Sequence, residues 1–363
     1  MSRNEKLSWI LLKGSPKEIG QTYGATFKEV FIAEAEALNE SLKVYDPHSV
    51  EEARLRLLET LQKHFPYLVE EMNSIAEATD LEPEIIQLIH FKPTFGRVVK
   101  ELKVLRTESI DSQNKDCSNI AFKESDRGPL LGKTLDGSST SGPNRLMAKV
   151  FPEDGHGMLL MMYLGTLNVE TGINDKGFAV GNSSIHFHST NPGGISRNLM
   201  VRLLLQECAN TEEGIEFLKK YSTVNRGYNF MLLDKDGNAA NVERSPTDYC
   251  VRRPENGVVF CVNHCMCENM IRDERLATGK ERYLNSRARW TNLQRIASKE
   301  NFKMTLGMMK NILRNHAEPG GICQHGSAGM YTNTSFVHIP LEGRMLFTVG
   351  NPCRNEFQVI SFN

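Results

Sequence analysis

The spacing of apolar residues changes from helix-like to strand-like at a polar stretch near residue 110. Residues 8–12 predict one short strand, and apolar residues then recur at helical spacing up to about residue 105. From Cys117 onward, short apolar runs separated by turn residues predict strands. Helical spacing returns at 195–208, 211–220, 281–298 and 303–314. A mainly helical segment followed by hairpin-rich strands and a few long helices predicts an α+β fold of packed layers.

Turn residues divide the second part of the chain into strand-length pieces. The turns at 174–177 (Asn-Asp-Lys-Gly) and 234–237 (Asp-Lys-Asp-Gly) end in glycine, which accepts the positive φ that tight hairpins need. Adjacent strands are therefore expected to pair antiparallel. The expected strands are 117–123, 129–135, 144–151, 157–163, 168–174, 177–184, 228–235, 238–244, 248–253, 257–261, 334–340, 343–349 and 356–362.

The stretch 106–116 is polar and is expected to form an exposed linker, a natural place for the chain to open after a backbone cut. It divides the chain into an N-terminal helical segment, 1–116, and a core, 117–363.

Composition and net charge limit the size of the core, the partners that the chain could bind and its location in the cell. With 363 residues, 40% of them hydrophobic, the chain can bury a large core as one domain or two. A net charge of −1 argues against nucleic acid or an anionic membrane as partner, and no apolar run approaches the ~18 residues of a membrane span. The charged start, Met1 to Leu7, is unlike a signal peptide. Eight cysteines in a chain of this size are expected to be mostly reduced, so we expect a cytoplasmic protein.

Cys117 opens one strand-like run, and Asp136 ends the next, 136 − 117 = 19 residues later. A short antiparallel pair would place the thiol and the carboxylate side by side. A cut before Cys117 would give that residue a thiol with a pKa near ~8.5 and an α-amine with a pKa near ~7.7–8.0. One residue would then supply both nucleophile and base, with no need for histidine, metal or cofactor.

Short motifs in a fixed order extend over most of the chain. They are Gly14-Ser15-Pro16-Lys17-Glu18-Ile19-Gly20 with Tyr23-Gly24, His64-Phe65-Pro66, Gly172-Ile173-Asn174 with Gly177-Phe178-Ala179-Val180, Glu243-Arg244-Ser245-Pro246, Val262-Asn263-His264-Cys265, Ser286-Arg287-Ala288-Arg289 and Gly350-Asn351-Pro352. In this order the chain resembles the acyl-coenzyme A:6-aminopenicillanic acid acyltransferase (isopenicillin N acyltransferase) family of N-terminal-nucleophile (Ntn) hydrolases.

The resemblance implies an αββα sandwich preceded by a mainly helical segment. It implies autocleavage between Asp116 and Cys117, with the two fragments remaining associated. Cys117 would be the nucleophile, Asp136 would hold its new α-amine, and the side-chain amide of Asn263 would donate to the oxyanion. The implied substrate is a small N-acyl amide, which would form an acyl-thioester with Cys117. Water, or a second amine, would accept the acyl group.

Three further residues fall at positions that have a supporting role at the active site in the family. For each of them a purely structural role is the alternative. Lys133 replaces an arginine of the related bile-salt and penicillin V hydrolases; it would lower the thiol pKa or be a surface lysine. Arg289 would hold a substrate carboxylate, orient the Cys117 region, or belong to a solvated basic helix face. Ser245 falls at a serine linked to processing, or simply closes a turn before Pro246.

The sequence departs from the family pattern at two places. Asp116 stands where the family has glycine, which puts cleavage in question. Tyr331 stands where it has an arginine near the active site, which puts the penicillin nucleus and coenzyme A in question. A processing-defective protein that binds a small ligand without catalysis therefore stays open.

The remaining histidine and cysteine residues suggest weaker hypotheses. His264 beside Asn263 would allow a Cys–His thiol protease. The cluster Cys261, His264, Cys265 and Cys267 does not follow a standard zinc spacing, so we expect no metal there. We expect Cys208, Cys250 and Cys353 to be reduced cysteines that pack in the core.

Overall fold

The computed structural model describes residues 7–102, 116–138, 145–224, 227–274 and 280–362. The start of the chain and residues 106–115 of the expected linker lie outside the described residues.

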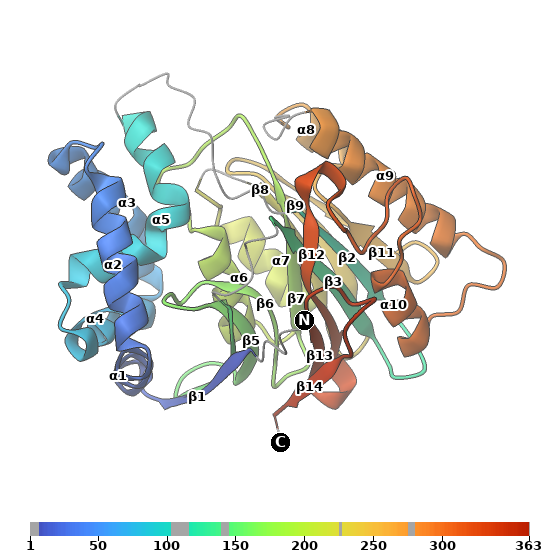
Figure 1. The fold of residues 1–363 in the computed structure, drawn as a ribbon, viewed down its shortest axis with the longest axis horizontal. Coiled ribbons are helices and arrows are strands. Elements are labelled where there is room, and N and C mark those ends of the chain that lie inside the picture. Colours follow the sequence, from blue (N-terminus) through green and yellow to red (C-terminus); the bar gives the residue numbers. More distant parts are fainter. Residues whose placement is uncertain (1–6, 103–115, 139–144, 225–226, 275–279, 363) are drawn as a thin grey trace.

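Two sheets form the centre of the molecule (Figure 1). The first has the order β1-β4-β5-β6-β7-β8-β9-β10, and the second β11-β2-β3-β12-β13-β14. Every strand expected from the sequence overlaps an observed one. The bounds are β1 (Ser8–Gly14), β2 (Asp116–Phe122), β3 (Leu130–Gly137), β4 (Arg145–Pro152), β5 (Met158–Tyr163), β6 (Val169–Asn174), β7 (Ala179–Ile185), β8 (Gly227–Leu233), β9 (Ala239–Arg244), β10 (Tyr249–Arg252), β11 (Val258–Cys261), β12 (Tyr331–Ile339), β13 (Arg344–Val349) and β14 (Gln358–Ser361).

Helices cover the outer faces of both sheets. The first sheet carries α6 and α7, the second carries α9 and α10, and the sheets meet through β2 and β7. The expected αββα sandwich is therefore confirmed. The bounds are α1 (Pro16–Thr26), α2 (Lys28–Leu42), α3 (Pro47–His64), α4 (Pro66–Thr79), α5 (Pro83–Leu102), α6 (Arg197–Glu207), α7 (Thr211–Lys220), α8 (Glu268–Ile271), α9 (Lys280–Ala297) and α10 (Leu306–Leu313).

The N-terminal helices form a separate group beside the first sheet (Figure 1). Ser15 caps α1 and forms a reciprocal capping box with Glu18. A Cβ at Gly20 would lie 2.4 Å from the Glu71 carbonyl oxygen, so glycine there lets α1 approach α4 closely. The segment is joined to the core by β1, which pairs parallel with β4 from Ser8↔Leu146 onward.

Cysteine pairing differs from the expectation. Cys250 and Cys267 form a disulfide, so the expectation that Cys250 is a reduced core thiol is wrong. The two residues are 17 positions apart and come together because β10 lies beside α8. The other cysteines are free.

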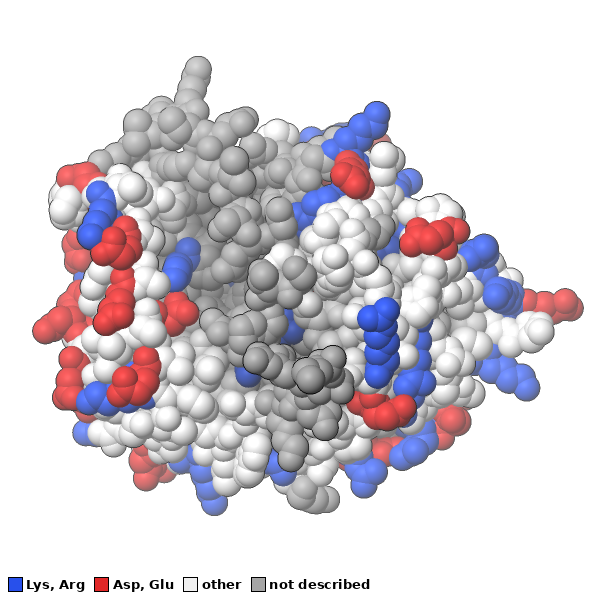
Figure 2. Space-filling view, viewed as in Figure 1, with Lys and Arg blue, Asp and Glu red and all other residues white. Residues whose placement is uncertain are grey.

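On the face shown in Figure 2, acidic and basic side chains are interspersed over the N-terminal helices and over the side that carries α9 and α10. Within the described residues, no helix is both long and apolar enough to cross a membrane. The cytoplasmic location and the exclusion of nucleic acid remain predictions.

Candidate active site

The register of β2 and β3 determines which way the catalytic candidates face. Cys117 lies opposite Leu135, and Asp116 lies opposite Asp136. Side chains alternate between the two faces of a sheet, so Asp136 shares its face with Asp116 and the thiol of Cys117 points the other way. The expectation that thiol and carboxylate lie side by side is wrong by this one-residue offset.

The thiol of Cys117 is buried between the two sheets. Its Sγ lies 4.0 Å from Oε1 of Glu170 on β6. The Lys133 ammonium lies 3.2 Å from the same oxygen and also donates to the Asn182 carbonyl. Lys133 is fully buried, so the surface-lysine alternative is wrong.

Burial raises the pKa of the Cys117 thiol to about 11. Lys133 acts in the expected direction and lowers this pKa, while Glu170 and Asp136 raise it. Desolvation is the largest of these effects, so the thiol of the uncut chain is protonated at neutral pH.

Arg289 is a fully buried residue of α9 that reaches the backbone of Cys117. Its Nη1 donates to the Cys117 carbonyl oxygen at 2.7 Å and to Ser118 Oγ at 3.0 Å. Its Nη2 donates to Asn263 Oδ1 at 3.0 Å. The solvated-face alternative is therefore wrong, and Arg289 orients the Cys117 region.

Asn263 holds the nitrogen that autocleavage would convert into an α-amine. Its Oδ1 accepts the Cys117 N–H at 2.9 Å, and its Nδ2 donates to the Ser184 carbonyl at 3.1 Å. The donors around Oδ1 fix the orientation of this amide. Asn263 thus lies beside Cys117, and its donation to an oxyanion remains a prediction.

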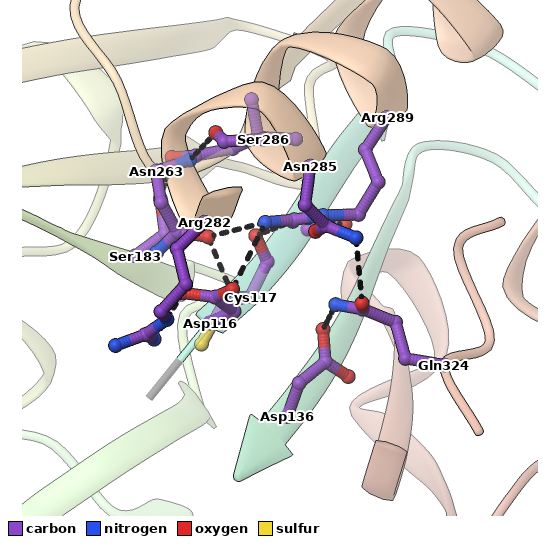
Figure 3. Close-up of polar contacts among 12 residues, drawn as sticks. Asp116, Cys117, Asp136, Ser183, Asn263, Arg282, Asn285, Ser286, Arg289 and Gln324 are labelled. Carbon is purple, nitrogen blue, oxygen red and sulfur yellow. Dashed lines mark hydrogen bonds and ion pairs between the residues drawn. The ribbon is translucent and has the colours of Figure 1, made fainter. Parts of the chain in front are cut away.

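Asp136 is connected to the backbone of Cys117 by a chain of side chains (Figure 3). Its Oδ1 accepts from Thr332 at 2.6 Å and its Oδ2 from Gln324 at 3.0 Å. Asn285 donates to Gln324 at 3.1 Å, and Arg289 donates to Asn285 at 2.9 Å. Asp136 is fully buried, and this burial raises its pKa to about 6 although Arg289 opposes the shift.

Asp116 is buried and ion-paired at the position where glycine was expected. Its Oδ1 accepts from Arg282, and Nη2 of Arg289 lies 3.6 Å from its Oδ2. Both arginines project from α9 (Figure 3). The charge of the Asp116 carboxylate is therefore compensated by two guanidinium groups.

Ser245 makes its side-chain contacts elsewhere, whereas Tyr331 lies opposite Gly137, the neighbour of Asp136. Ser245 Oγ accepts the N–H of Asp248 at 2.8 Å and that of Thr247 at 3.2 Å, which is the geometry of a turn serine. Tyr331 begins β12 and is exposed. No hydrogen bond between described residues joins either side chain to Cys117.

His264 lies beside Asn263 but bonds elsewhere. Its Nδ1 is 2.8 Å from Ser286 Oγ. Burial, followed by nearby arginines, lowers its pKa to about 3, so the ring is neutral. In the cluster of Cys261, Cys265 and Cys267 around it, Cys267 is in the disulfide and is not available as a metal ligand. Potential metal ligands come together elsewhere among the described residues, beside the start of β12.

Sequence reasoning missed Glu170, Arg282 and Gln324. An acidic residue inside the strand-like run 168–174 was a usable signal for Glu170. Arg282 was seen only as part of a basic helix. Gln324 carried no signal, because its position beside Asp136 depends on the loop before β12.

The model of one family, acyl-coenzyme A:6-aminopenicillanic acid acyl-transferase, matches residues 122–323, more than half of the chain. The chain belongs to this family. The matched acyltransferase region contains Lys133, Asp136, Ser245, Asn263 and Arg289. It begins five residues after Cys117 (122 − 117 = 5) and ends at Cys323. No curated protein matches the sequence.

Solved structures of three hydrolases are similar to this member of the acyltransferase family. A variant of conjugated bile acid hydrolase from Clostridium perfringens is 13% identical, with a TM-score of 0.44 over 68% of this chain and 97% of that chain. Penicillin V acylase from Agrobacterium tumefaciens is 15% identical, with a TM-score of 0.43 over 68% and 86%. The Caenorhabditis elegans ortholog of N-acylethanolamine-hydrolyzing acid amidase is 12% identical, with a TM-score of 0.44 over 62% and 93%.

Proposed function

We propose that this chain is an autoprocessing Ntn amidohydrolase or acyltransferase that cleaves the amide C–N bond of a small N-acyl compound through an acyl-thioester on Cys117. One observation carries the proposal: side chains hold both backbone groups of Cys117. Asn263 binds its nitrogen at 2.9 Å and Arg289 binds its carbonyl oxygen at 2.7 Å. A structural cysteine does not require such positioning, whereas a nucleophile does.

Self-cleavage is the first step of the proposal. Sγ of Cys117 attacks the carbonyl carbon of Asp116, the C–N bond breaks, and the thiol proton passes to the Cys117 nitrogen. Water then hydrolyses the resulting thioester, releasing the new carboxylate of Asp116 and the free thiol. Before the cut no α-amine exists, and Glu170 at 4.0 Å from Sγ is the carboxylate able to take the thiol proton in transit.

Turnover uses the new α-amine. The amine takes the thiol proton, Sγ attacks the acyl carbonyl of the substrate, and the proton passes to the leaving amine. Asn263 donates to the developing oxyanion, and Asp136 keeps the α-amine in place through the side chains that connect it to Arg289. Water resolves the thioester in hydrolysis, and a second amine resolves it in acyl transfer.

A non-catalytic, processing-defective protein is the second candidate. The observation that favours it is the buried Asp116, paired with Arg282 and Arg289, where the family has glycine. These ion pairs would hold the uncut backbone in place.

A Cys–His protease is less well supported. The ring of His264 contacts Ser286, and no hydrogen bond between described residues joins it to Cys117.

The test is acylation of Cys117 by substrate. Processed protein is incubated with N-acyl amino acids, N-acyl amines and acylated β-lactams, then quenched in acid and weighed intact. We expect one acyl group on the C-terminal fragment, mapped to Cys117, together with release of the amine. A chain that stays uncut, remains unacylated and releases no amine from any of these compounds would support the non-catalytic candidate.

A further inference from the structure

A second cluster of reactive side chains lies outside the proposed active site. It consists of His316 after α10, Cys323 and His325 before β12, and Cys353 after β13. One ligand atom from each residue lies within 4.8 Å of those of the other three. Residues from three separate segments thus converge on one point.

The spacing of the ligand atoms fits a single tetrahedral ion. Sγ of Cys323 and Sγ of Cys353 are 3.7 Å apart, and they lie 3.4 and 3.3 Å from Nε2 of His325. Nε2 of His325 lies 3.1 Å from Nε2 of His316. Around a tetrahedral Zn²⁺, bond lengths of ~2.3 Å to sulfur and ~2.0 Å to nitrogen give ligand separations of about 3.8, 3.5 and 3.3 Å for S–S, S–N and N–N pairs.

We propose that His316, Cys323, His325 and Cys353 bind one Zn²⁺ ion in a structural site. Two sulfur and two imidazole ligands in tetrahedral geometry are the donor set that favours zinc over harder cations. The four protein ligands fill every coordination position, so the ion has no place for a substrate or a reactive water. Binding converts the two thiols to thiolates and releases two protons to solvent.

The surroundings of the cluster support a metal site. Asn351 points its Nδ2 toward Cys323 Sγ at 3.7 Å and donates to the Gln324 carbonyl at 2.9 Å, an outer contact of the kind that orients metal ligands. His316 and His325 are exposed and Cys353 is half-buried, so an ion can enter from solvent.

The proposed zinc site would influence the active site through Gln324. Gln324 lies between the ligands Cys323 and His325, and its side chain donates to Asp136 at 3.0 Å. A bound ion would fix the backbone on both sides of Gln324. Gln324 is then a positioning residue that the metal keeps against Asp136.

The zinc site could not be recognised from the spacing of its ligands in the sequence. Cys323 and His325 form a short Cys-x-His pair, but His316 precedes Cys323 by 323 − 316 = 7 residues and Cys353 follows His325 by 353 − 325 = 28. No standard zinc motif has this order. The expectation that Cys353 is a core cysteine overlooked its three partners.

The test measures metal binding directly. Full-length protein is purified with reductant, stripped with chelator, and titrated with Zn²⁺ and with Co²⁺, whose thiolate charge-transfer absorption reports sulfur ligation. We expect one ion per chain and a rise in the thermal midpoint on zinc addition. His316→Ala and Cys353→Ser should each weaken binding at least tenfold, and each should abolish the rise. The matched controls His48→Ala, at an exposed histidine of α3, and Cys208→Ser should bind like wild type.

Two results of the metal titrations would overturn the proposal. One is zinc binding that is equal in wild type and in the double variant H316A/C353S, with both proteins folded by circular dichroism. The other is a Co²⁺ spectrum without thiolate absorption in protein whose six free thiols are all titratable with a thiol reagent. A Cys323–Cys353 disulfide that persists in reductant would exclude the site as well, since it removes both sulfur ligands.

Discussion

The carbonyl oxygen of Cys117 accepts a 2.7 Å hydrogen bond from Arg289, which follows it by 172 residues. The same guanidinium donates to Asn263, whose Oδ1 accepts the Cys117 N–H. Helix α9 therefore fixes the peptide groups on both sides of the Cys117 Cα. Its placement over the second sheet couples the position of Cys117 to the packing of a helix that is distant in the sequence.

Replacing Arg289 should impair self-cleavage even when the charge is kept. Arg289→Lys cannot reach Cys117, Asn263 and Asn285 together, because an ammonium lacks the planar fork of donors. Losing hydrogen bonds to a charged group costs about 1.5–3 kcal/mol each, so we expect cleavage to slow by about 10- to 100-fold. The fraction cleaved is followed in time by denaturing electrophoresis. Arg295→Lys, at an exposed position of the same helix, is the control. Equal rates for R289K and wild type would remove Arg289 from this role.

Asn263→Ala should reduce kcat of the processed enzyme by roughly 10²–10³, since one oxyanion donor is worth about that much in the transition state. KM should change little, because the donor acts where charge develops. His264→Ala should cost much less, since its ring bonds Ser286. The two variants are compared on the processed fraction with the best substrate of the screen. If His264→Ala abolishes turnover and Asn263→Ala does not, the Cys–His mechanism is correct.

The fold was predictable because its signals are local. Strand-length apolar runs and turns such as 174–177 and 234–237 specified the hairpins, and Pro66 and Pro83 begin α4 and α5 as first-turn prolines do. Family motifs predicted that Cys117 and Asn263 lie together, and contact with Cys117 was one of three alternatives for Arg289. Side-chain direction was not predictable to that degree, because a one-residue offset in register moves Asp136 to the opposite face from the thiol. The contact of Gln324, in the loop before β12, with Asp136, in β3, corresponds to no local pattern in the sequence.

Asp136 should make stability depend on pH in a specific direction. Burial raises its pKa from 3.8 to about 6, so the folded state binds this proton more tightly than the unfolded chain does. The stabilisation is complete below the unfolded pKa and is lost as pH rises through the folded one. A shift of this size corresponds to about 3 kcal/mol.

To test this pH dependence, the stability of an Asp136→Asn variant is compared with that of its parent. Both proteins carry Cys117→Ala, so that processing does not differ between samples. Asp136→Asn removes the titrating group and keeps the shape. As the pH rises from ~3.5 to ~7, the free energy of unfolding of the Asp136→Asn variant should increase by about 3 kcal/mol relative to that of the Cys117→Ala parent. Denaturant titration at each pH measures this difference. A difference that stays constant over this range would show that Asp136 has an ordinary pKa.

The N- and C-terminal fragments should remain bound after cleavage. Glu71 of α4 and Arg202 of α6 form a fully buried ion pair at 3.1 Å, and β1 stays paired with β4. Removing one partner of a buried pair costs about 3–5 kcal/mol, so Arg202→Met should lower the denaturant midpoint of fragment dissociation. E71L/R202M should recover part of the loss, because no charge is then left buried. Fragments that separate on native gel filtration of the wild type would contradict this prediction.

Self-cleavage at Cys117 is the central claim, and the mass of the purified protein under denaturing conditions tests it most directly. Wild type should give two fragments of 116 and 363 − 116 = 247 residues, with cysteine at the new N-terminus. Cys117→Ala should give one full-length chain, because no thiol is present to attack the Asp116 carbonyl. A wild-type chain that stays intact, or an alanine variant cut at the same bond, would contradict the account.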